Sequence, residues 1–268
     1  MAQLQAKKSL GQHFLADENI LRRIATAADI KQDEAVIEIG PGTGLLTKHL
    51  LEEPLSKLTA FELDDRAVEF LGHEIRDEKF SVEHIDFLKV SLKDFTPEGE
   101  RLNVIGNIPY YITSPIVFKL LEERASIRSS TLLMQLEVAD RLCGKPRTKE
   151  YGIPSVIAQC FAEVTFLFKV KAGAFRPPPK VDSAVIRLNF DRDHFTRTGR
   201  AKPANFSDKQ FATMVRTLFA MRRKTLRNNM KTFELPEASL VALEPFFTRR
   251  AEELTVDEFL NLYELLFP

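Results

Sequence analysis

The chain has 268 residues, of which 44% are hydrophobic and 28% charged, and its 38 basic side chains balance its 38 acidic ones. This composition is ordinary for a globular protein, and the length allows one large domain or two unequal ones. The two cysteines, Cys143 and Cys160, lie 17 positions apart without a Cys-x-x-Cys spacing. That argues against a disulfide framework and against a zinc site.

The chain carries no export or membrane-spanning signal. Its first residues, Met1–Lys8, lack the apolar segment of a signal peptide, and no apolar run approaches the length of a membrane helix. We therefore expect a cytoplasmic protein. We also expect a monomer without a bound metal.

The N-terminal segment Lys7–Leu15 is a short basic, polar arm, followed by Asp17 as the N-cap of a helix. An arm of this composition is also typical of a frayed terminus. The next apolar run, Ala35–Ile39, predicts a strand that leads into closely spaced glycines, Gly40 and Gly42 among them. A strand, a glycine loop and a helix indicate a nucleotide-binding turn. The spacing is neither the dinucleotide fingerprint nor a Walker motif, so the ligand need not carry a pyrophosphate.

Acidic residues follow the next two predicted strands. Leu58–Phe61 ends in Glu62, at the place where a doubly wound fold holds ribose hydroxyls. Ser81–Ile85 ends in Asp86, which can accept a hydrogen bond from an adenine amine or cap the segment that follows.

The fourth predicted strand, Leu102–Gly106, delivers the motif Asn107-Ile-Pro109-Tyr110. The Asn107 carbonyl and the backbone carbonyls beside Pro109 can accept both hydrogens of an exocyclic amine, and Tyr110 can lie flat against the ring. Asn-x-Pro is also common in ordinary turns. In a parallel sheet the glycine, acid, acid and amide that end these four strands share one edge, where ligands bind.

Further along, Thr131–Leu136 predicts a fifth strand, and a proline-rich loop joins two later strands, Val164–Val170 and Ser183–Phe190. The prolines make this loop stiff, so that it presents Phe175 and Arg176. Phe175 can face Tyr110 across a flipped base, or it can serve the structure alone.

The C-terminal third is predicted to form a separate helical domain. We place a first domain at residues 1–190, a linker at 191–206 and the helical domain at 207–268. Residues 192–232 contain 11 Lys and Arg against 2 Asp, which indicates a polyanion partner, although a solvated face is the alternative. The candidate RNA-binding residues are Arg216, Arg222, Arg223, Lys224 and Arg227, with Arg216, Arg223 and Arg227 on one face if the helix continues.

Together these motifs resemble the ribosomal RNA adenine N6,N6-dimethyltransferases, above all those that act on two adjacent adenosines near the 3′ end of the small-subunit (16S) RNA. The resemblance rests on the arm segment Gly11–Leu15, the Glu38–Gly44 loop, Glu62–Asp64, Asp86, Asn107–Tyr110 and Phe175–Ser183. It implies a Rossmann-like α/β fold of the class I S-adenosylmethionine-dependent methyltransferases, with a smaller all-α C-terminal domain. It further implies the immature small ribosomal subunit as the partner.

The resemblance also implies roles for individual residues. The positions that match cofactor-binding residues are His13, Leu15, Gly40, Gly42, Glu62, Asp86 and Asn107. The positions that match catalytic residues are Asn107, Pro109, Tyr110 and Phe175. His13 and Tyr111 replace frequent asparagines of the family. A large-subunit methyltransferase of the macrolide-resistance type and a ribosome-assembly factor that acts by binding are the alternatives.

Overall fold

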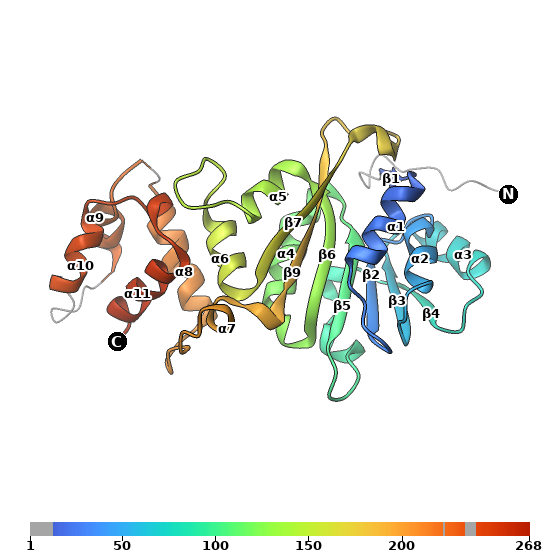
Figure 1. Cartoon of the computed structure of the whole chain (residues 1–268), viewed down its shortest axis with the longest axis horizontal. Coiled ribbons are helices and arrows are strands. Elements are labelled where there is room, and N and C mark those ends of the chain that lie inside the picture. The colour runs from blue at the N-terminus through green and yellow to red at the C-terminus, as the bar shows by residue number, and fades with distance from the viewer. Residues whose placement is uncertain (1–12, 222, 234–239) are drawn as a thin grey trace. The chain divides into compact units, whose positions relative to one another are not determined.

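The computed structural model describes residues 13–221, 223–233 and 240–268 (Figure 1). They form two compact units, one of Met1–Ala139 with Thr165–Asp191 and one of Asp140–Val164 with Arg192–Pro268. Within the described residues, no helix is both long and apolar enough to cross a membrane. The segment Lys7–Gln12 of the predicted arm lies outside the described residues.

The first unit is built on a seven-stranded sheet with the strand order β4-β3-β2-β5-β6-β9-β7. The strands β2 to β6 run parallel to one another, and β9 runs antiparallel to β6. The bounds are β2 Ala35–Ile39, β3 Lys57–Glu62, β4 Phe80–His84, β5 Leu102–Asn107, β6 Ile127–Gln135, β7 Glu163–Val170 and β9 Ser183–Asn189. This confirms the predicted α/β class and the predicted order of strands and motifs.

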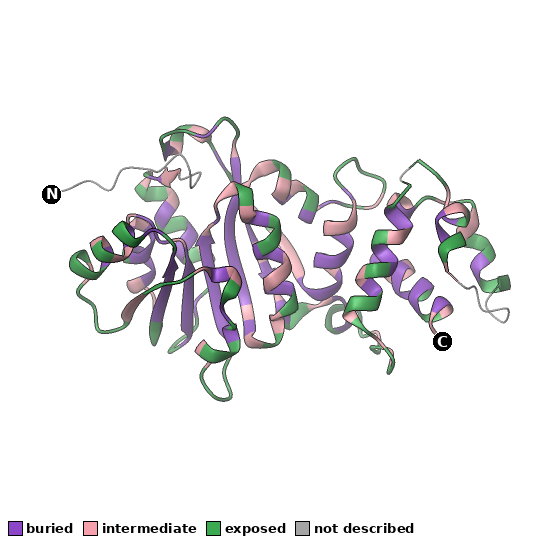
Figure 2. Cartoon of the chain, turned by 180° about the vertical axis from the view of Figure 1, so that it is seen from behind, coloured by how far each residue is buried: buried purple, intermediate pink, exposed green. Residues whose placement is uncertain are grey.

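Helices cover this sheet, which explains the apolar strands. All five residues of β2 and the first five of β5 are buried, as expected for parallel strands with both faces covered (Figure 2). The helices of this part of the chain are α1 Glu18–Ala27, α2 Leu45–Leu51, α3 Asp65–Glu74, α4 Thr113–Glu122 and α5 Leu136–Leu142. Leu21 of α1 and Leu50 of α2 pack in one cluster with Leu58 of β3. Asp17 caps α1 as predicted, accepting from the backbone N–H of Asn19 and of Ile20.

A second, two-stranded sheet was not predicted. It pairs β1 Phe14–Leu15 with β8 Phe175–Arg176, so that Leu15 lies opposite Phe175. The pairing ties the residues after the N-terminal arm to the proline-rich loop. Such a contact between distant segments leaves no periodic signal in either one.

The second unit is mostly helical. Its helices are α6 Ile153–Phe161, α7 His194–Thr198, α8 Asp208–Phe219, α9 Leu226–Asn229, α10 Leu240–Phe247 and α11 Val256–Leu266. The Thr255–Glu258 capping box opens α11. Helix α6 was expected in the first domain but belongs to this unit. It contacts α7, α8 and α11, and its buried residues include Val156 and Phe161.

The expected linker, residues 191–206, is a folded part of this unit. It contains α7, and the ring of Phe195 in that helix packs edge-on against Phe206, with 5.4 Å between the centroids. Phe206 in turn contacts Phe211 and Tyr263. The polar composition of residues 191–206 did not indicate these aromatic contacts. The first unit ends at Asp191, within one residue of the predicted boundary, but residues 140–164 and the expected linker from Arg192 onward belong to the second unit.

Candidate active site

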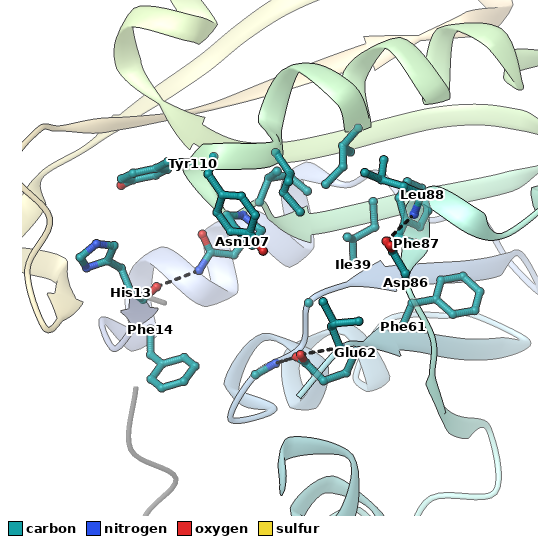
Figure 3. A pocket seen from close by; sticks show the side chains of 18 of the residues that line it. His13, Phe14, Ile39, Phe61, Glu62, Asp86, Phe87, Leu88, Asn107 and Tyr110 are labelled. Carbon is teal, nitrogen blue, oxygen red and sulfur yellow. Dashed lines mark hydrogen bonds between the residues drawn. The ribbon is translucent and has the colours of Figure 1, made fainter. Parts of the chain in front are cut away.

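The four predicted strand ends meet at one pocket (Figure 3). Because β2, β3, β4 and β5 are parallel and in register, the residues that end them lie at the same edge of the sheet. The predicted site residues that line the pocket are His13, Gly40, Gly42, Glu62, Asp86, Asn107, Pro109, Tyr110 and Phe175. Leu15 is the exception, because it is buried and lines a smaller cavity next to this pocket.

The glycine loop passes close to a neighbouring ring. Gly40, Gly42 and Gly44 all have positive φ, a region in which residues with a Cβ are strained. At Gly42 (φ +56°) a Cβ would also lie 2.8 Å from Cε1 of Phe14, closer than the two carbons can approach. The loop therefore depends on glycine for its conformation and for space.

The two carboxylates are oriented by backbone N–H groups. Glu62 Oε1 accepts from the N–H of Leu63 at 2.8 Å and of Asp64 at 2.9 Å, whereas Oε2 accepts, among the described residues, from Gly42 alone at 3.1 Å. Because each carboxylate oxygen can accept about two hydrogen bonds, Oε2 retains capacity for a hydroxyl group. Asp86 caps the short helix that follows β4, accepting from Leu88 at 3.0 Å, and also lines the pocket. The capping interpretation of Asp86 is therefore confirmed, and its contact with an adenine amine stays a prediction that its place in the pocket allows.

Asn107 ends β5 with a defined amide orientation. Its Nδ2 donates to the backbone carbonyl of His13 at 3.2 Å, so Oδ1 is the amide atom that can act as an acceptor (Figure 3). The Pro109 carbonyl already accepts from Ile112 at 3.1 Å and from the hydroxyl of Thr113 at 3.3 Å. This leaves the carbonyl of Ile108, a residue that also lines the pocket, as the candidate for a second acceptor beside Asn107.

Tyr110 is held at its hydroxyl and lies against another ring. Its hydroxyl group hydrogen-bonds that of Ser183, which is fully buried at the start of β9, at 2.7 Å. Burial raises the pKa of Tyr110, Ser183 partly offsets this, and the charge of Asp182 adds to it, so the phenol is neutral. The ring of His13 stacks on Tyr110 with 5.7 Å between the centroids and 28° between the planes.

The interpretation of Phe175 as a ring presented by a stiff loop is wrong. Its side chain lines the pocket wall, but it is 0% exposed and belongs to the hydrophobic core. The pairing of β8 with β1 turns it inward. His13, which the sequence associated only with the cofactor, is the ring that faces Tyr110.

The sequence interpretation missed apolar residues of the pocket. Leu63, Ile85 and Phe87 line it, and Leu63 and Ile85 are 50% and 38% exposed. Each is adjacent in sequence to Glu62 or Asp86, which is the signal that could have identified them. Exposed apolar side chains beside two hydrogen-bonding carboxylates suit a ligand with a flat ring and polar edges.

The basic residues of the second unit do not share one helix face. Helix α8 carries Arg216 and ends at Phe219, because the chain then turns into α9. Arg223 and Lys224 lie exposed between the two helices, and Arg227 lies in α9, 5.7 Å from the ring centroid of Phe247. The fifth candidate, Arg222, lies outside the described residues. The expectation of a continuous arginine face is therefore wrong, and RNA binding by these basic residues stays a prediction.

Known proteins match this chain along almost its whole length. Residues 3–266 match the family model described as ribosomal RNA adenine dimethylase. The chain is similar to "Ribosomal RNA small subunit methyltransferase A" of Chlorobium phaeobacteroides (strain BS1), with 44% identity over 99% of this chain and 95% of that protein. The protein of the same name in Flavobacterium johnsoniae is 41% identical over 98% of this chain and 96% of its own length.

Two solved structures extend this similarity. A dimethyladenosine transferase from Plasmodium falciparum superposes with a TM-score of 0.78 at 26% identity, covering 93% of this chain and 96% of that one. The 23S rRNA methyltransferase ErmE superposes with a TM-score of 0.68 at 30% identity, covering 95% of this chain and 100% of its own.

Proposed function

We propose that this chain, which belongs to the ribosomal RNA adenine dimethylase family, is the enzyme that dimethylates N6 of two adjacent adenosines near the 3′ end of small-subunit (16S) rRNA during ribosome biogenesis. The relatives named as small-subunit methyltransferases, 41% and 44% identical along nearly the whole chain, support the small subunit. The observation that carries the proposal is the orientation of Asn107, whose amide nitrogen is held by His13 while its oxygen is left as an acceptor.

The pocket supports S-adenosylmethionine as the methyl donor, because a carboxylate with spare acceptor capacity, a second carboxylate and exposed apolar side chains suit its ribose and adenine. Glu62 would accept from the ribose hydroxyls, and Asp86 would accept from the adenine amine. Leu63 and Ile85 would cover the faces of the adenine. When bound, this cofactor supplies an electrophilic methyl group on a positively charged sulfur.

The residues at the end of β5 would prepare the target amine. The lone pair of adenine N6 is delocalised into the ring, which makes it a weak nucleophile. Oδ1 of Asn107 and the carbonyl of Ile108 would accept its two hydrogens and favour a pyramidal nitrogen with a localised lone pair. Such fixed dipoles and the positioning they impose are expected to account for most of the rate.

Each transfer would form one carbon–nitrogen bond and break one carbon–sulfur bond, and the nitrogen would then lose one proton to solvent as its N–H bond breaks. Two transfers would complete the product. Tyr110 would hold the extruded base by stacking, which is worth about 1–3 kcal/mol per base. Ser183 would help to position the ring of Tyr110 through its hydrogen bond with the hydroxyl. His13 covers a face of this ring in the structure and would have to move aside for a base to stack on that face.

The basic cluster of the second unit supports rRNA as the partner. Arg223 and Lys224 are exposed in a segment with an excess of nine positive charges, from 11 Lys and Arg less 2 Asp at residues 192–232. Clustered positive charge of this kind suits the phosphate backbone of RNA. Recognition of the immature subunit, monomeric action and a cytoplasmic location belong to the same proposal.

The test is transfer of a tritiated methyl group from S-adenosylmethionine to purified small subunits that lack the modification, with large subunits in parallel. Mass spectrometry of the digested RNA identifies the product. We expect dimethyladenosine in the small-subunit RNA alone. Incorporation confined to large subunits would assign the chain to the type represented by ErmE, and tight binding without incorporation would make it an assembly factor.

A further inference from the structure

A buried acid beside the pocket has no role in the function proposed above. Glu38, in the middle of the sheet on β2, is 1% exposed. Its Oε2 lacks a hydrogen-bond partner among the described residues, and so does the buried hydroxyl group of Thr47 on α2. Buried polar atoms of this kind are rare and call for an explanation, because a missing partner costs free energy.

Glu38 lines a small cavity that adjoins the pocket. Gly40, Asn107 and Phe14 line both spaces, so the cavity lies directly beside the glycine loop and the catalytic amide. Its described lining residues include no Lys, Arg or His. Glu38 is thus next to the site but has no cation to stabilise its charge.

The surroundings of Glu38 favour its neutral form. Burial raises its pKa to about 8, the nearby hydroxyl of Thr47 lowers it, and the negative charge of Glu62 on β3 raises it. Among the charged side chains on neighbouring strands and helices, Glu62 is the one that shifts the pKa of Glu38. At neutral pH the free protein therefore holds Glu38 mostly protonated.

We propose that Glu38 is a proton-linked residue of the cofactor site, which is protonated in the free protein and releases its proton to solvent when cationic S-adenosylmethionine binds. This inference rests on the proposed function. On binding, the O–H bond of Glu38 breaks, its electron pair remains on the carboxylate, and the proton passes to the buffer. A positive ligand in the adjoining pocket favours the ionised acid, because it offsets the negative charge of Glu62 that opposes ionisation of Glu38. The demethylated product, S-adenosylhomocysteine, has lost the sulfonium charge and should release less of the proton.

The number of protons released can be measured by isothermal titration calorimetry at pH 7 in phosphate and in Tris, which differ in ionisation heat. We expect the wild type to release between about half and one proton per cofactor, since a group with a pKa of about 8 is mostly protonated at pH 7. Glu38→Gln should remove this release, and the difference between the two proteins excludes any titration of the ligand itself. Glu83→Gln, the same change at an exposed position of β4, should behave like the wild type.

The affinity for S-adenosylmethionine should also depend on pH. Because the cofactor favours ionised Glu38, affinity should rise as pH increases towards 8, by at most about tenfold per pH unit, and become level above that pKa. The Glu38→Gln variant should lack this component of the pH dependence.

Infrared difference spectroscopy of the wild type keeps the inference testable even if the variant fails to fold. A protonated-carboxyl band should disappear when the cofactor binds. Equal proton release by the wild type and Glu38→Gln, or binding without loss of that band, would overturn the inference and leave the proposed function intact. Failure of the wild type to bind S-adenosylmethionine would overturn both.

Discussion

Replacing Asn107 with alanine tests the mechanism at its centre. The substitution removes Oδ1, the acceptor for the target amine, together with the 3.2 Å hydrogen bond from Nδ2 to the His13 carbonyl. Loss of one preorganised hydrogen-bonding group of this kind reduces a catalytic rate by about 10²–10³-fold. Only the carbonyl of Ile108 would remain to hold the amine. We expect the single-turnover rate of methyl transfer to fall by at least that range.

The assay uses small subunits that lack the modification and saturating S-adenosylmethionine, so that the rate reports transfer and not cofactor affinity. Filter binding should show that affinity for the RNA is nearly unchanged, since Asn107 lies in the pocket and not in the basic cluster. Asn189→Ala is the matched control, because Asn189 ends β9 opposite Ser129, away from the strand ends that form the pocket. A transfer rate near that of the wild type would refute the role of Asn107.

Three further predictions concern other residues of the pocket and the basic segment of the second unit. Ser183→Ala should lower the transfer rate about fivefold by freeing the hydroxyl of Tyr110, with one hydrogen bond worth about 1 kcal/mol. Tyr110→Phe should have a similar effect, and additive losses in the double variant would contradict the coupling. Gly42→Ala should weaken S-adenosylmethionine binding about tenfold, because the new side chain is strained at φ +56° and contacts Phe14. Gly99→Ala is the control and should leave binding unchanged, because Gly99 has φ +77° but open space around it. Equal effects of the two substitutions on binding would refute the steric explanation. Reversing charge at Arg223 and Lys224 should reduce RNA affinity and flatten its salt dependence, by about one unit of slope for each phosphate that is no longer neutralised. If reversing the charge of exposed Lys57 and Lys93 reduced RNA affinity equally, the basic cluster would have no specific role in RNA binding.

The parts of the site that the sequence predicted are those encoded locally. An apolar run followed by a glycine or a polar residue marks both a buried strand and its functional end, as in Ala35–Ile39 with Gly40 or Leu102–Gly106 with Asn107. Since parallel strands end at the same edge, local patterns were sufficient to predict that Glu62 lies near these residues.

The parts that failed depend on contacts between distant segments. Phe175 is buried because β8 pairs with Phe14–Leu15, about 160 positions away, and nothing in the proline-rich loop records that pairing. The unit to which α6 belongs is decided by its partners α8 and α11, which lie far along the chain. The orientation of Asn107 depends on His13, which precedes it by 94 positions. Each of these outcomes requires the tertiary fold.

The most direct test of the central claim is a crystal structure of the chain with S-adenosylmethionine bound. The proposal predicts that the ribose contacts Glu62, that the adenine amine contacts Asp86, and that the methyl group faces the open side of Asn107 and Tyr110. A cofactor bound elsewhere, or one bound in this pocket with its methyl group directed away from Asn107, would contradict the proposed mechanism.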